Sequence, residues 1–214
     1  MKLKTQELIW LNPSTPYSKE YADRYYSEGN PEDECKHVYL TANGLPDRWI
    51  RPSERRFIVA ELGFGFGLNF ILSAALHTEL KIQNHLHYIA FEKSPPSKEH
   101  AFKFFSNFPK LQTFSDIYLE KIPKLIRGCH RIQFSENVTL DLHYGDVRHE
   151  ISDLYTERLK ISAWFVDGFA PKNNPSIWSD FVCRKISQLS GHGTTLSSYS
   201  AAGSFRRNLI FNGF

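Results

Sequence analysis

Short apolar runs alternate with amphipathic stretches along the chain from residue 56 onward. A continuous apolar run is typical of a strand that is buried on both faces of a sheet. The predicted strands, of which the last is more polar, are residues 57–62, 86–92, 138–144, 161–167 and 194–200. Apolar residues recur at helical spacing over residues 68–80, 97–105, 147–159, 177–189 and 204–211. This alternation predicts an α/β fold with a doubly wound, mainly parallel sheet over residues 55–214, while residues 106–135 stay ambiguous.

The first 54 residues follow neither pattern. They are rich in Tyr, Pro, Asn and Glu, and they contain turn signals such as Asn12-Pro13 and Asn43-Gly44. The segment His37–Thr41, which precedes Asn43-Gly44, resembles one arm of a β-hairpin. We therefore expect residues 1–54 to form a small β-rich N-terminal appendage, with no linker between it and the domain of residues 55–214.

The net charge is small but unevenly distributed. Residues 1–54 carry 7 basic and 9 acidic side chains, whereas residues 55–214 carry 19 and 14. A polyanionic partner is therefore expected at the later part of the chain.

The three cysteines are far apart and the nine histidines lack metal-ligand spacing, so we expect no disulfide framework and no metal. No apolar run suits a membrane span or a signal peptide, and we expect a cytoplasmic protein with no membrane partner.

A glycine-rich segment joins the first predicted strand of the sheet to the helix after it. Gly63, Gly65 and Gly67 follow Glu61 here, and glycines at such a junction let the backbone approach a ligand closely. A tight turn without a ligand is the alternative. The carboxylate of Glu61 would repel a phosphate but would suit the ammonium group of a methionine moiety.

Two more acidic residues end the second and third predicted strands. Glu92 stands where an acidic residue grips ribose hydroxyls in related nucleotide sites, and Asp146 can accept from an exocyclic adenine amine. Each could instead be a solvated acid. Because the carboxyl ends of parallel strands meet at one edge of a sheet, Glu61, Glu92 and Asp146 together favour S-adenosylmethionine as the bound cofactor.

A fourth acid, Asp167, ends an apolar strand and precedes the loop Gly168–Pro171. A carboxylate at this point can orient a nucleophilic amine near a methyl donor and accept its proton, directly or through water. The alternative interpretation is a helix N-cap aspartate. Arg206 and Arg207 could contact phosphates, although a solvated basic face is the favoured interpretation of each alone.

Longer stretches resemble the methyltransferase domain of the MnmC family of bifunctional enzymes that modify the wobble uridine of tRNA. They are ELGFGFGLNF (61–70), HYIAFEKSP (87–95), VTLDLHYGD (138–146), AWFVDGFAPKNNPSIW (163–178) and TTLSSYSAAGSFRRNLIFNGF (194–214), with weaker matches in YADRYYS (21–27) and DECKHVYL (33–40). The resemblance implies a class I S-adenosylmethionine-dependent methyltransferase fold, which is Rossmann-like. It also implies methylation of a 5-aminomethyl-(2-thio)uridine in the tRNA anticodon loop, completing 5-methylaminomethyl-(2-thio)uridine.

The resemblance also implies roles for individual residues. The residues from Glu61 to Gly67, Glu92 and Asp146 would hold the cofactor, and Asp167 would face the amine. Phe169 would stack on the unpaired base. Lys172, Arg206 and Arg207 are further candidates for contacts with RNA.

The chain departs from the family pattern at three places. Phe66 stands where a small polar residue is common, and Lys172 comes one position earlier than the family lysine, which Asn173 replaces. The family sheet has two further strands beyond residue 214, and bifunctional members then carry a flavin oxidoreductase domain. We therefore expect a truncated sheet with residues 194–200 at its edge, and a separate flavin oxidoreductase that acts on the same tRNA position. A small-molecule amine methyltransferase, or an inactive homologue that only binds cofactor or RNA, is the alternative.

Overall fold

The computed structural model describes residues 3–27, 29–50, 55–154 and 159–214. Within these residues, six strands form one sheet in the order β6-β7-β5-β4-β8-β9. Their bounds are β4 (Arg56–Leu62), β5 (His85–Glu92), β6 (Gly128–Ser135), β7 (Val138–Tyr144), β8 (Ile161–Val166) and β9 (Ser190–Ser198). Only the β6–β7 pair in this sheet is antiparallel. The structure therefore confirms the predicted mainly parallel α/β sheet. Strand β5 lies on one side of β4 and β8 lies on the other, so the strand order switches direction between β4 and β8.

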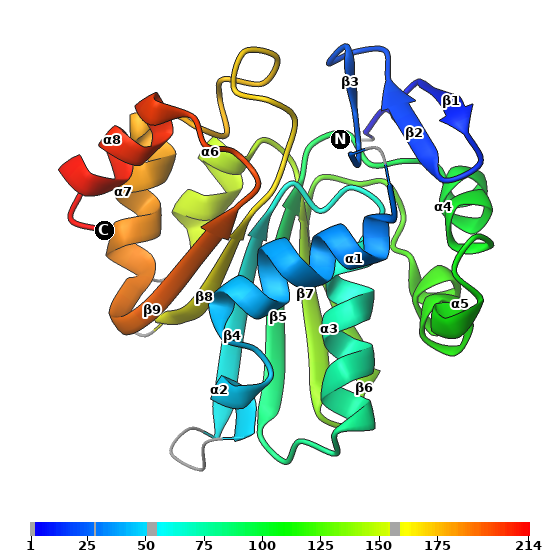
Figure 1. Ribbon diagram of the computed structural model, residues 1–214, viewed down its shortest axis with the longest axis horizontal. Helices are drawn as coiled ribbons and strands as arrows, with labels where there is room; N and C mark the ends of the chain where they lie inside the picture. The colour runs from blue at the N-terminus through cyan, green and yellow to red at the C-terminus, as the bar shows by residue number, and fades with distance from the viewer. Residues whose placement is uncertain (1–2, 28, 51–54, 155–158) are drawn as a thin grey trace.

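Helices cover both faces of this sheet (Figure 1). Alternate residues of β5 show the two-sided burial, since Tyr88 belongs to one apolar cluster and Ile89 to the other. The first face packs against α1 (Pro31–Cys35), α3 (Leu68–Glu79), α4 (Lys98–Phe105) and α5 (Gln112–Lys121). The second face packs against α6 (Val147–Glu150), α7 (Asp180–Leu189) and α8 (Gly203–Phe211). Short apolar runs became strands because both of their faces are covered.

The N-terminal segment contains strands only in its first part. A three-stranded antiparallel sheet is formed by β1 (Leu8–Asn12), β2 (Thr15–Ser18) and β3 (Asp23–Arg24). The chain is helical afterwards, in α1, a π-helical turn η1 (Lys36–Leu40), a 3-10 turn η2 (Thr41–Asn43) and α2 (Asp47–Ile50). The expectation of a β-rich appendage therefore holds for residues 8–24 alone among the described residues. The proposed boundary falls in residues 51–54, which lie outside them, so the division into domains stays a prediction.

The predicted hairpin arm at His37–Thr41 is wrong. Asn30 caps α1 by accepting a hydrogen bond from the Glu32 N–H, and Pro31 occupies the first helical position. Cys35 and Tyr39, four positions apart, are both buried against the sheet, as a helical period requires. Gly44 has a φ of 67° and ends the helical segment, so Asn43-Gly44 is a helix terminus and not a hairpin turn.

Polar contacts from Asn43 and Arg48 fix this part of the chain to strands β8 and β9. The Asn43 side-chain amide donates to Ser197 Oγ at 2.6 Å, and Arg48 Nη2 donates to the Ser162 carbonyl at 2.9 Å. Since Asn43 is 1% exposed, this contact lies inside the protein core. Residues 31–50 therefore belong to the packed body of the molecule and do not stand apart from the sheet.

The remaining elements differ from expectation mainly at their ends. The ambiguous stretch 106–135 folds as η3 (Pro109–Leu111), α5 and β6, while the predicted helix 147–159 is α6 and a 3-10 turn η4 (Ile151–Asp153), with residues 155–158 outside the described part. The helix expected from residue 177 begins at Asp180, because Ser179 caps it.

Among the described residues β9 pairs with β8 alone, so it is an edge strand as expected. No helix in the described part of the chain is long and apolar enough to cross a membrane.

Candidate functional site

A cavity of about 290 Å³ lies at the carboxyl ends of the central strands. This volume is near the lower end of the range for small-molecule pockets, roughly 300–1,000 Å³. The cavity is bounded by the β4–α3 loop, the ends of β5, β7 and β8, and the N-terminal segment 21–39. It lies between β4 and β8, where the order of the strands in the sheet switches direction. Ligands usually bind at this point in open α/β sheets.

The glycine loop forms the floor of this cavity. Gly63 and Gly65 line it, whereas Gly67 caps α3 and does not. Gly63 has a φ of 83°, and a Cβ placed there would lie 2.6 Å from the carbonyl oxygen of Asp167. The loop can therefore pass close to the end of β8 only because residue 63 has no side chain.

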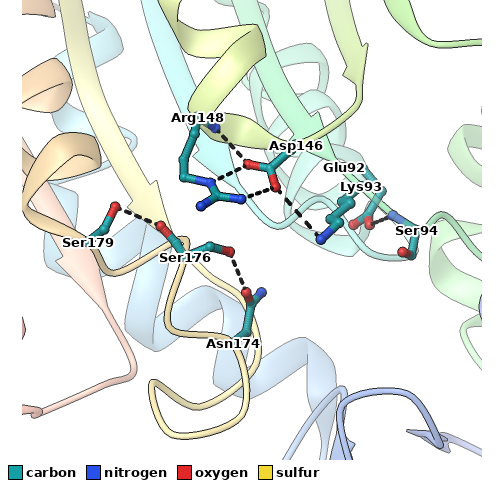
Figure 2. Close-up of polar contacts among 8 residues, drawn as sticks. All are labelled: Glu92, Lys93, Ser94, Asp146, Arg148, Asn174, Ser176 and Ser179. Carbon is teal, nitrogen blue, oxygen red and sulfur yellow. Dashed lines mark hydrogen bonds and ion pairs between the residues drawn. The ribbon is translucent and has the colours of Figure 1, made fainter.

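Glu92 lies beside the glycine loop with both of its oxygens held by backbone groups. The Gly65 N–H donates to Oε2 at 2.8 Å and the Ser94 N–H donates to Oε1 at 2.7 Å, the second contact being visible in Figure 2. Burial raises the pKa of Glu92 despite these bonds. A fixed acceptor at the wall of the cavity is suited to a hydroxyl donor such as a ribose diol.

Asp146 also lines the cavity, but basic side chains already engage it. Figure 2 shows Arg148 and Lys93 reaching this carboxylate, with Nη2 of Arg148 at 2.8 Å and Nζ of Lys93 at 3.7 Å. The hydrogen bonds from Arg148 lower the pKa of Asp146 to about 2, so it is ionised at neutral pH. Any donor from an adenine base must share these oxygens with Arg148.

Glu61 does not reach the surface of the cavity. It is 1% exposed, and its two oxygens accept from the Asn69 amide at 2.7 Å and from the Tyr88 hydroxyl at 3.0 Å. Burial and then the nearby charge of Asp167 raise its pKa well above the usual range. Glu61 is therefore a buried support behind the cavity wall, and its direct contact with a ligand stays a prediction.

Asp167 lines the cavity at the end of β8. Its carboxylate accepts from the Gly168 N–H at 2.8 Å and from the Asn69 amide at 3.2 Å. Burial raises its pKa to about 7, although these hydrogen bonds oppose the shift. The alternative of a helix cap is wrong, because the residue that caps the next helix is Ser179. A carboxyl group that can gain or lose a proton near neutral pH is suited to accept one from an amine.

Aromatic side chains from the N-terminal segment form the opposite wall, and the sequence analysis missed them. The ring of Tyr21 stacks on Phe169 with centroids 4.6 Å apart, and Tyr25 meets Phe169 edge to face at 5.0 Å. Asp23 fixes this wall to the loop after β8 by accepting from the Ala170 N–H at 2.9 Å. Phe169 lines the cavity as expected of a base-stacking residue, but Tyr21 already covers one face of its ring.

Other predicted contacts lie away from the cavity. Lys172, Arg206 and Arg207 are exposed and do not line it, and the two arginines belong to α8 on the second face of the sheet. Their contacts with RNA stay predictions. Among the described residues no group of three or more His, Cys, Asp or Glu side chains is arranged to hold a metal ion.

Comparisons with known proteins agree with this geometry. Residues 109–214 match a family described as S-adenosyl-L-methionine-dependent methyltransferase. Over 97% of its length the chain is 35% identical to the tRNA 5-methylaminomethyl-2-thiouridine biosynthesis bifunctional protein MnmC of Aliivibrio fischeri, of which it covers 32%. The protein of the same name from Idiomarina loihiensis is 39% identical over 93% of this chain and 34% of its own length. The chain is therefore similar to S-adenosyl-L-methionine-dependent methyltransferases over residues 109–214 and to MnmC proteins over nearly its whole length.

A solved structure supports the same fold. The crystal structure of MNMC2 from Aquifex aeolicus aligns with a TM-score of 0.78 at 22% identity, over 99% of this chain and 65% of that one. The fold is therefore the Rossmann-like methyltransferase fold that the sequence predicted. The chain spans about a third of the length of the curated relatives it matches.

The residues around the cavity fit the cofactor that the family name implies. The glycine loop leaves room where side chains would otherwise stand. The Glu92 carboxylate, which the Gly65 N–H holds in place, can accept hydrogen bonds from the ribose hydroxyls. One buried polar atom at the cavity, Asn69 Oδ1, has no hydrogen-bond partner within the described residues. Unpartnered buried groups are costly and are commonly satisfied by an ordered water or a bound molecule. The cofactor class predicted from the sequence is confirmed by the family, while the contacts of individual residues stay proposals.

Proposed function

We propose that this chain transfers a methyl group from S-adenosylmethionine to the amine of 5-aminomethyl-(2-thio)uridine at the wobble position of tRNA. The observation that carries the proposal is the position of Asp167, a buried carboxyl group on the cavity wall, next to the glycine loop of a chain that is similar to methyltransferases. The names of the relatives support the tRNA substrate and do not favour a small-molecule amine as the acceptor.

The chemistry requires a neutral amine held in line with the methyl group. S-adenosylmethionine supplies an electrophilic methyl group on a positively charged sulfur. In its ionised form Asp167 accepts a hydrogen bond from the amine, which orients the nitrogen lone pair, and it can take the proton that leaves as the N–C bond forms. The pKa of about 7 allows Asp167 to be ionised before the reaction and protonated after it.

The aromatic wall explains how a nucleobase could enter. A wobble uridine is unpaired in the anticodon loop, so moving it into a pocket costs little base-pairing energy. Tyr21 and Phe169 stack face to face at the cavity, and a pyrimidine can replace one ring of such a stack. The basic surplus of residues 55–214 would attract the phosphates of the tRNA backbone. We place the protein in the cytoplasm with its tRNA substrate, and we assign formation of the free 5-aminomethyl group to a flavin oxidoreductase.

Methyl transfer to undermodified tRNA tests this function. The chain is incubated with S-adenosylmethionine and tRNA that carries 5-aminomethyl-2-thiouridine, and the nucleosides are separated and identified by mass spectrometry. We expect a mass increase of one methyl group at the wobble nucleoside, and an Asp167→Asn variant as control should be slower by about 10²–10⁴-fold. A chain that binds the cofactor but leaves this nucleoside unchanged, or that methylates only free amines, would contradict the proposal.

A further inference from the structure

Asn69 joins two buried acids through one side chain. It belongs to the first turn of α3, is 5% exposed and lines the cavity. Its amide nitrogen donates to Glu61 Oε1 at 2.7 Å and to Asp167 Oδ2 at 3.2 Å. With its nitrogen turned toward both acids, Asn69 has an oxygen that finds no hydrogen-bond partner among the described residues. One donor group is therefore shared between two carboxyl groups.

The surroundings of this pair make two negative charges unfavourable. The ionisable groups that act on the pair come from every element packed around it, and they are acids, tyrosines and a cysteine. They are Tyr26, Glu34, Cys35, Tyr39, Tyr88, Glu92, Tyr118 and Tyr199. Two cations, Arg24 and Lys93, line the same cavity, and Lys93 lies beside Asp146. Like charges in a poorly solvated site cannot both ionise at low cost, so one of the two acids retains a proton.

Glu61 is the acid that keeps its proton more firmly. It is 1% exposed behind the wall, away from the solvent that would stabilise its charge, although the Asn69 amide and the Tyr88 hydroxyl both donate to it. Asp167 instead faces the cavity, where a bound cation would stabilise its charge. The buried hydrogen-bonded series Tyr88–Glu61–Asn69–Asp167 therefore ends at Asp167, where the charge of a ligand in the cavity can act on the carboxyl group.

We propose that Asn69 links Asp167 and Glu61 into one acid pair that releases a proton when a cationic ligand, here the sulfonium form of the cofactor, occupies the cavity. Asn69 acts as a positioning residue, because it touches Asp167 and Glu61 and holds them in register with one another. The proposal rests on the proposed function for the choice of ligand. It assigns to Glu61 the task of keeping Asp167 neutral in the empty cavity, and to Asn69 that of holding the two acids together and supporting the charge of Asp167 once the cavity is filled.

Proton release on cofactor binding tests this pair without any tRNA. Calorimetric titration of the full chain near pH 7, in buffers of different ionisation enthalpy, counts the protons released with S-adenosylmethionine. We expect a substantial fraction of one proton, and less with S-adenosylhomocysteine, whose sulfur is neutral. Asp167→Asn should lose this release, whereas Asp116→Asn, at an exposed acid of α5 that does not line the cavity, serves as the matched control and should keep it.

Variants of Asn69 separate its positioning role from a merely structural one. In Asn69→Leu both acids lose a donor that favours their charged form, so the pH of half-maximal release should move upward by about one unit. Equal proton release in the wild type and in Asp167→Asn, or an unchanged midpoint in Asn69→Leu, would overturn the proposal. Proton release without methylation of tRNA would instead refute the proposed function and leave the acid pair intact.

Discussion

Adding one methyl group at Gly63 should disrupt both the fold and the site. The φ of 83° at this residue is strained for alanine, at a cost of roughly 1–2 kcal/mol. The new Cβ would also lie 2.6 Å from the carbonyl oxygen and 2.9 Å from the carbonyl carbon of Asp167. Both contacts are with backbone, which cannot rotate away, so the loop and the end of β8 must separate.

The magnitude follows from these two effects. Overpacking a tight site costs typically 1–3 kcal/mol, and adding the backbone strain gives about 2–5 kcal/mol in total for Gly63→Ala. The matched control is Gly191→Ala in β9, where the φ is ordinary and the nearest atom to a Cβ is Lys160 Cβ at 3.6 Å. Removing a glycine at such an unstrained position should change stability by less than about 1 kcal/mol.

Urea unfolding followed by fluorescence measures both variants against the wild type, and calorimetry measures their affinity for S-adenosylhomocysteine. We expect Gly63→Ala to lower the free energy of unfolding and to weaken binding, since the displaced loop carries the Gly65 N–H that holds Glu92. If both variants unfold at the same urea concentration and bind equally well, the close approach of the loop to Asp167 is not a constraint on the fold.

Three further predictions concern acids. Glu92→Ala should weaken S-adenosylmethionine binding about tenfold or more in calorimetry, because a charge-assisted hydrogen bond worth about 1.5–3 kcal/mol is lost. Burial raises the pKa of Asp167 in the folded protein above its unfolded value, so ionisation of Asp167 lowers the stability as the pH rises toward about 7. The Asp167→Asn variant should therefore have a higher melting temperature than the wild type at pH 8, and a lower one would contradict this. Burial alone would raise the pKa of Asp141, but hydrogen bonds from Arg131 at 2.6 Å and His87 at 2.7 Å hold it well below its unfolded value. Asp141→Asn should lower the free energy of unfolding at pH 7 by about 1.5 kcal/mol, with the difference shrinking as the pH falls below about 4, and a pH-independent difference would refute the charge pairing.

The sheet could be predicted because its strands carry their own signal. A strand such as β7, buried on both faces, needs an apolar run of its own length, and the predicted and observed bounds of β7 agree. The acids Glu92, Asp146 and Asp167 were likewise predictable as one cluster, because parallel strands end at the same edge of a sheet.

The N-terminal contribution could not be predicted in the same way. Asn30-Pro31 was a readable helix start, but the nearby Asn43-Gly44 carries the sequence signal of a hairpin turn as well as that of a helix end. The aromatic wall depends on contacts such as that of Tyr21 with Phe169, which no local pattern encodes. Asn69 offered a weak signal, as a polar residue at a helix position that is otherwise apolar.

The N-terminal segment that supplies a wall of the cavity, with Asn43 just beyond it, has a consequence for the order in which the protein folds. Asp23 bonds to Ala170 and Asn43 bonds to Ser197, so the wall closes chain loops of roughly 150 residues, at an entropic cost of about 4 kcal/mol. Contacts of such high sequence separation form late in folding and open early during thermal fluctuations. A ligand that needs the closed wall must therefore slow its opening, and amide hydrogen exchange in residues 21–43 should slow on cofactor binding more than exchange in the central strands. This wall would thus be among the last parts of the fold to settle, and its local opening rate would limit how quickly the cavity exchanges its contents.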